Sequence, residues 1–389
     1  MKTWISIAFA TLGLTGFWAA PADALPTFAQ AYGVKCNVCH TAVPQLNSYG
    51  RYVQRTGYAA LSYELLKDHT PVTFSESPTY DTSRGNGRIE FGNTAIHIAG
   101  YITKNLTVHV HQWFAQGGQP GGLDTLQLQY SNPNMFKGSL HLFAGKLSAL
   151  PVPAPFSNGS DLTPFASAEL TVGEHMYQSD MMRWGASASY VGSKFYSQIA
   201  WLGSNADLSG ATDYGPDTDK TFQWIAAYAD ASKPFEAGLY GSSGSYPLAE
   251  GGFDRYNTIA AYVQRDPGLR GVPGFFATYQ IGNDNNPGQA ASGGMAPPGM
   301  GGSMFGPSHG TALTLEAYEP LFNGSALVAL RKEVANDGLG TISNTQSLDI
   351  AVTPLSRYQY LHLYFEGKTQ PGMGPAWADM AWWAVPVGR

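Results

Sequence analysis

The chain has little charge and almost no cysteine. Of its 389 residues, 13% are charged and two are cysteine. The net charge is -6, so the excess of Lys and Arg that phosphate binding needs is missing, which excludes a nucleic-acid partner. After the N-terminal segment no apolar run approaches the roughly 20 residues of a spanning helix. A polytopic helical membrane protein is therefore excluded, whereas a membrane β-barrel with alternating strands is not.

The N-terminus is typical of an export signal. Lys2 is followed by an apolar run from Ile5 to Ala19 and by the small residues of Ala22-Asp23-Ala24. We expect residues 1–24 to be a signal peptide cleaved after Ala24, which would place the mature chain in an oxidising compartment. The alternative, an uncleaved anchor helix, is disfavoured because the apolar run is short.

Both cysteines belong to one motif. Cys36 and Cys39 are followed directly by His40, the C-x-x-C-H order of c-type haem attachment. The two thiols would bind the haem vinyl groups as thioethers, and His40 would be the proximal iron ligand. A disulfide, a redox C-x-x-C or a zinc site is disfavoured, because no βαβ pattern and no second ligand pair surround the motif. The sequence therefore predicts one covalent haem c.

The motif lies in a short helical segment. Leu46, Tyr49, Val53 and Leu61 recur at helical spacings, which predicts a small monohaem cytochrome domain over residues 25–70 and a linker over 71–87. This segment contains no methionine after Leu25, so the sixth iron ligand would be His69, a barrel side chain or water. We favour a barrel side chain or water over His69.

From Arg88 onward the hydrophobic period changes to two. Fifteen alternating segments run from Arg88–Ile102 to Met380–Val387, and a weaker candidate at Ala166–Gly173 makes sixteen. Residues 88–389 are therefore predicted to form an all-β, porin-like outer-membrane barrel of about sixteen strands, with fourteen as the alternative. A secreted β-sandwich or propeller is disfavoured because no blade repeat is visible. The Met-rich stretch within Gly282–Gly310 is expected to be a low-complexity loop rather than a soft-metal site.

The N-terminal segment resembles a known family. The run from Phe28 to Leu46, with Tyr49-Gly50-Arg51 and Gly57-Tyr58 after it, is similar to the cytochrome of the fused monohaem cytochrome-porins. That family is associated with oxidation of extracellular iron(II) at the outer membrane, and its members join a short cytochrome to a barrel. The resemblance implies Cys36 and Cys39 as haem attachments and His40 as proximal ligand.

These observations predict an electron conduit in the outer membrane. An extracellular donor, with Fe(II) favoured, would pass electrons through the haem to a periplasmic cytochrome or copper protein, an Fe(II)-oxidase-like activity. The cytochrome domain would lie at the periplasmic end or inside the barrel. The alternative is a diffusion porin whose haem domain is a plug or gate. A haem peroxidase is disfavoured because no distal acid–base pair is present in the first seventy residues.

Strand alternation predicts that five histidines face the lumen. In the segment from Leu106, the residues Leu106, Val108 and Val110 share one face, so His109 and His111 share the other. The same pattern places His97, His141 and His362 inward, the last together with Glu366. We expect these side chains to line one wall and to supply a sixth haem ligand or a path for metal ions or protons.

Overall fold

The computed structural model describes most of the chain between Pro26 and Val387. The described residues are 26–42, 45–69, 71–81, 88–116, 119–147, 165–172, 175–178, 182–203, 221–247, 253–267, 272–285, 307–322, 325–352, 360–370 and 376–387. The expected signal peptide and the methionines of the 282–310 stretch lie outside these residues.

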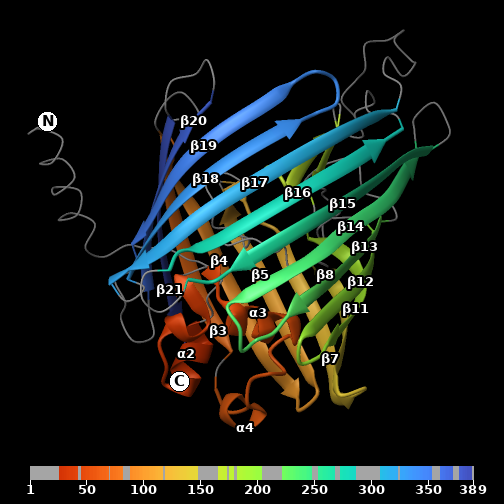
Figure 1. Cartoon of the computed structure of the whole chain (residues 1–389). Coiled ribbons are helices and arrows are strands. Elements are labelled where there is room, and N and C mark those ends of the chain that lie inside the picture. Colours follow the sequence, from red (N-terminus) through yellow and green to blue (C-terminus); the bar gives the residue numbers. More distant parts are fainter. Residues whose placement is uncertain are drawn as a thin grey trace, which may run out of the picture.

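A closed antiparallel β-barrel makes up most of the described chain (Figure 1). Successive long strands pair along the sequence, and the last strand pairs with the first to close the ring. Two-residue β6 (Gln119–Pro120) lies between β5 and β7, which also pair directly. The sixteen long strands within the described residues are β3 (Val72–Asp81), β4 (Arg88–Thr103), β5 (Leu106–Gln116), β7 (Leu123–Met135), β8 (Gly138–Leu147), β11 (Arg183–Val191), β12 (Phe195–Leu202), β13 (Thr221–Ala229), β14 (Phe235–Pro247), β15 (Phe253–Arg265), β16 (Gly274–Asp284), β17 (Ser308–Leu321), β18 (Ala326–Asn336), β19 (Ile342–Val352), β20 (Tyr360–Thr369) and β21 (Ala376–Pro386).

The barrel is apolar outside and polar inside. In β12, the outward residues Ile199 and Trp201 are 53% and 58% exposed. Gln198, which directly precedes Ile199 and points inward, is 4% exposed. Other strands bury Gln223 and Gln280 in the same way. A soluble barrel would reverse this pattern, because exposing large apolar side chains to water is unfavourable. The exterior therefore fits a lipid environment.

The prediction of a linker over residues 71–87 is wrong for residues 72–81. Residues 72–81 form β3, which pairs with β4 on one side and with β21 on the other. Pro78 and the small polar residues suggested a linker. However, the register with β4 shifts between Ser77 and Thr79, and such an irregularity accommodates a proline that cannot donate to the ladder.

The weak strand candidate at residues 166–173 is not part of the barrel wall. β9 (Glu169–Val172) pairs with β10 (His175–Gln178) as a separate two-stranded sheet. Leu170 and Val172 are fully buried among residues of the wall. A Cβ atom at Gly310 of β17 would lie 2.3 Å from the Thr171 carbonyl oxygen, so the wall needs glycine here. The hairpin fills part of the lumen.

Residues 26–69 form a small, mainly helical segment at one end of the barrel (Figure 1). Its elements are α2 (Pro26–Tyr32), the 3-10 turn η1 (Cys36–Val38), β1 (His40–Ala42), β2 (Gln45–Leu46), α3 (Ser48–Arg55) and α4 (Tyr63–Leu66). Val53, Leu61 and Leu66 form its buried core, as the helical spacing predicted, whereas Tyr49 and Leu65 are exposed. No helix among the described residues is long and apolar enough to cross a membrane. We call residues 26–69 the plug segment.

Candidate functional site

Both cysteines of the C-x-x-C-H motif lie on a single tight turn, and His40 begins β1 directly after it. Cys36 begins η1, and the backbone N–H of Cys39 donates to the Cys36 carbonyl at 3.1 Å. Both cysteines are free thiols, and Cys36 is 7% and His40 6% exposed. Burial raises the pKa of each thiol to about 11, so both are neutral at physiological pH. Two unbridged thiols on one turn with a buried imidazole next to them fit the donor set of a covalent haem.

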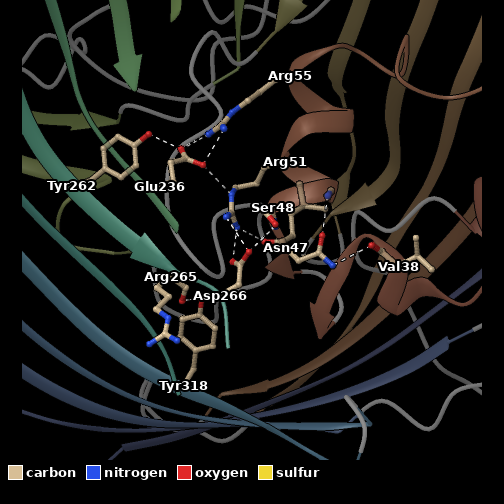
Figure 2. Close-up of polar contacts among 12 residues, drawn as sticks. Val38, Asn47, Ser48, Arg51, Arg55, Glu236, Tyr262, Arg265, Asp266 and Tyr318 are labelled. Atoms are coloured by element: carbon tan, nitrogen blue, oxygen red, sulfur yellow. Dashed lines mark hydrogen bonds and ion pairs between the residues drawn. The ribbon is translucent and has the colours of Figure 1, made fainter. Parts of the chain in front are cut away.

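Helix α3 packs directly against this turn. The Asn47 side chain caps the helix by accepting from the Gly50 N–H at 2.9 Å, and its amide nitrogen donates to the Val38 carbonyl at 3.1 Å (Figure 2). A Cβ atom at Gly50 would lie 2.0 Å from the Cys39 carbonyl oxygen. Position 50 therefore requires glycine for the helix to approach the motif this closely.

Two arginines of α3 fasten the plug segment to the wall at β14 and β15. Arg51 contacts Glu236 at 3.2 Å and Asp266 at 2.9 Å, and Arg55 donates to Glu236 at 2.9 Å through Nη1 and more closely through Nη2 (Figure 2). Tyr262 also donates to Glu236, at 2.6 Å. We call Arg51, Arg55, Glu236 and Asp266 the latch.

The latch is almost completely removed from water. The four charged side chains are between 3% and 10% exposed. Burial alone would lower the pKa of the Arg55 guanidinium, but the attraction of Glu236 outweighs it and the pKa is raised. The pKa of Arg51 is raised in the same way by Asp266 and Glu236. Both arginines therefore stay charged, and each depends on its carboxylate partner.

The other side of the plug segment is bound to β4, β5 and β7. Tyr101 donates to the carbonyls of Tyr58 and Leu61 at 3.2 and 2.8 Å, and Thr107 donates to the Gly57 carbonyl at 2.8 Å. Gln129 donates to the Thr56 carbonyl. Because β4 to β7 and β14 to β15 are separated by several strands in the ring, the plug segment spans the lumen.

Three of the predicted histidines come together. His97 and His111 pair across β4 and β5, with their rings stacked 4.0 Å apart, and His109 lies 6.4 Å from His97. His109 also contacts Tyr58 of the plug segment at 5.9 Å, edge to face. The Nδ1 atom of His111 lies 2.9 Å from an Asp124 carboxylate oxygen. We call His97, His109 and His111 the histidine cluster.

The remaining predicted residues are placed differently. His141 is buried on β8, where Ser131 and Ser139 contact its two ring nitrogens at 2.8 and 2.7 Å, and no described ring contact joins it to the cluster. His362 and Glu366 lie on β20, paired with Trp382 and Ala378, and their side chains are outside the description. His69 follows α4, and its buried Nδ1 has no hydrogen-bond partner within the described residues. Of the five predicted histidines, His97, His109 and His111 lie together on one part of the barrel wall.

The latch was not foreseen from sequence. Arg51 and Arg55 are four residues apart and so share a helix face, which was the available indication. Glu236 and Asp266 lie 185 and 215 residues beyond Arg51, and a single sequence contains nothing that pairs groups at that separation.

Comparison with known proteins shows the fold. No protein-family model matches the chain, and no curated protein matches it. Among solved structures, the anion-selective porin from Comamonas acidovorans matches with a TM-score of 0.52 at 11% identity, covering 80% of this chain and 97% of the porin. The outer membrane channel DcaP of Acinetobacter baumannii matches with a TM-score of 0.52 at 11% identity, covering 81% and 95%. OmpT of Vibrio cholerae matches with a TM-score of 0.51 at 8% identity, covering 82% and 97%. The chain has the porin-like fold of outer-membrane barrels.

Proposed function

We propose that this chain is an outer-membrane electron conduit. Cys36 and Cys39 would hold one haem c, and His40 would be its proximal ligand. The haem supplies a one-electron carrier when bound. Electrons would come from an extracellular donor, with Fe(II) as the favoured donor, and leave to a periplasmic cytochrome or copper protein.

The observation that carries the proposal is the position of the motif. The C-x-x-C-H turn belongs to a segment bound to two separate parts of the lumen wall through the latch and through Tyr101, Thr107 and Gln129. A segment fastened by buried ion pairs holds its redox motif at a fixed place in the barrel. Fixed position favours electron transfer more than the opening and closing of a gate.

The orientation of the barrel supports a periplasmic site for the plug segment. Short turns such as Lys104-Asn105 and Phe136-Lys137 lie at the end where β3 begins, directly after the plug segment. At the opposite end the connections are longer, as between Leu147 of β8 and Arg183 of β11. Outer-membrane barrels have short periplasmic turns and long extracellular loops. The haem motif would therefore be close to periplasmic acceptors, with the donor arriving from the loop side.

A second candidate is a diffusion porin with a haem-containing plug or gate. The fold comparison favours it, because the similar structures include an anion-selective porin and an outer membrane channel. The two functions make different demands on the plug segment, which must stay in place for a conduit and must move for a gate.

One experiment on the intact purified protein separates the two. Fe(II) is added anaerobically to the oxidised protein while the haem absorbance is recorded, and solute flux is measured in liposomes containing the same preparation. Rapid appearance of the reduced-haem spectrum with little flux supports the conduit. Flux of small solutes without a response of the haem to Fe(II) would favour the porin.

A further inference from the structure

The histidine cluster begins at the plug segment and continues toward the loop side of the barrel. Tyr101 and Thr107, which bind the plug segment, are paired neighbours on β4 and β5. The inward positions that follow hold His109, then the His97–His111 pair, and then Trp113, whose ring lies 4.6 Å from His111. The row therefore runs along the inner face of β4 and β5 from the plug segment toward the loop side.

Ring nitrogens in this row are buried without partners. His97 is 3% and His111 7% exposed, and neither His97 Nδ1 nor His111 Nε2 has a hydrogen-bond partner within the described residues. His109 Nε2 is also buried and unpartnered there. Leaving a buried polar atom unpaired is unfavourable, so three such atoms on neighbouring rings indicate a missing ligand.

The contact with Asp124 prepares His111 to bind a metal. When Nδ1 donates its proton to the Asp124 carboxylate, Nε2 carries the free lone pair, and the carboxylate fixes the orientation of the ring. The hydroxyl of Thr125 donates to the same Asp124 oxygen at 3.2 Å and helps to fix it. This carboxylate–histidine arrangement is common behind histidine ligands of transition metals.

We propose that His97 and His111, supported by Asp124, form an exchangeable binding site for a divalent transition-metal ion. Neutral imidazole suits such ions, whereas hard ions such as Mg²⁺ and Ca²⁺ prefer oxygen ligands. The two residues are paired across neighbouring strands with ring centroids 4.0 Å apart, which is close enough for both to bind one ion once the rings turn out of their stacked arrangement. Use of this site by Fe(II) on its way to the plug segment rests on the proposed function, whereas metal binding itself does not.

The small number of ligands determines the character of the site. No group of three or more His, Cys, Asp or Glu side chains in the described part of the chain is arranged to hold a metal ion. Structural zinc sites use four protein ligands, and catalytic ones use three. A two-histidine site completed by water binds more weakly and releases its ion, as a site for a passing ion requires.

The test uses Zn²⁺, which has no redox chemistry and so probes binding separately from electron transfer. Haem-loaded, oxidised full-length protein is purified through a tag without histidine and titrated by calorimetry. We expect Zn²⁺ binding in the wild type and its loss in His97→Ala and in His111→Ala. His141→Ala is the matched control, because His141 is a buried lumenal histidine whose nitrogens both have partners, and its Zn²⁺ affinity should be unchanged.

A folding check and a milder variant complete the test. Each variant is first shown to be a folded barrel by its heat-dependent mobility on a gel. Asp124→Asn keeps both rings and should weaken Zn²⁺ binding by about 10- to 100-fold, the usual cost of removing a carboxylate behind a ligating histidine. Unchanged Zn²⁺ binding in both histidine variants, or equal loss in His141→Ala, would overturn the proposal. Failure of the iron(II) response with intact Zn²⁺ binding would refute the proposed function alone.

Discussion

Replacing Glu236 with glutamine removes a carboxylate that both arginines of α3 share. Glu236 accepts hydrogen bonds from Arg51, from two nitrogens of Arg55 and from Tyr262. After the change Arg51 still has Asp266, but the buried guanidinium of Arg55 faces a neutral amide and the ring of Tyr196 at 4.4 Å, with no carboxylate among its described contacts. The perturbation is therefore an uncompensated buried charge at the contact between plug segment and wall.

The burial of Arg55 and Glu236 sets the free energy that this substitution is expected to cost. Breaking a buried ion pair by removing one partner costs about 3 to 5 kcal/mol. Each 1.4 kcal/mol is a factor of ten in an equilibrium, so opening of the plug segment should become about 10²- to 10⁴-fold more frequent. The barrel strands make few contacts with this carboxylate beyond Tyr262 and should remain folded.

Amide hydrogen exchange measures this effect residue by residue. Amides of α3 should exchange faster by the stated factor in Glu236→Gln, while amides of β17 and β18 keep their protection. Glu64→Gln is the matched control, because Glu64 pairs with Lys67 at 2.7 Å but is 71% exposed, and its loss should leave exchange unchanged. Equal protection of α3 in wild type and Glu236→Gln would refute the role given to the latch.

Three further outcomes are expected. The double variant Cys36→Ala/Cys39→Ala should lose covalent haem staining while its barrel still inserts, and persistent staining would contradict the attachment. Gly50→Ala should lower the haem content, because its Cβ would lie 2.0 Å from the Cys39 carbonyl oxygen, whereas Gly203→Ala, with its nearest atom at 3.6 Å, should not. Tyr101→Phe removes the hydroxyl that two plug-segment carbonyls share and should destabilise docking of the segment by about 1 to 3 kcal/mol, measured by hydrogen exchange. Equal exchange of residues 58–61 in both proteins would show that this hydroxyl is unimportant.

Strand positions could be predicted because the physics of a barrel wall is local. In β12 the outward Ile199 and Trp201 face lipid and the inward Gln198 faces the lumen, so a period of two appears in the sequence itself. β3 was missed because Pro78 and the serines around it resemble a linker. Residues 72–81 pair with the next strand, β4, and also with β21, which lies almost three hundred residues later and leaves no local mark.

In the candidate site, too, the local features could be predicted from the sequence and the contacts between distant residues could not. The C-x-x-C-H motif is contiguous, and alternation alone placed His97, His109 and His111 on the inner face. That His97 stacks on His111 depends on the register between β4 and β5, and that His141 is occupied by two serines depends on its neighbours. The latch joins a helix to distant strands, so only the three-dimensional structure reveals it.

Electron transfer across a membrane tests the central claim most directly. The chain is inserted in liposomes that enclose oxidised cytochrome c and a chelator that traps any Fe(II) crossing the membrane, and free Fe(II) is added outside. An electron conduit should reduce the enclosed cytochrome with the wild-type chain and should not do so with Cys36→Ala/Cys39→Ala. No reduction by the haem-loaded wild type, or the same reduction with the double variant, would contradict it.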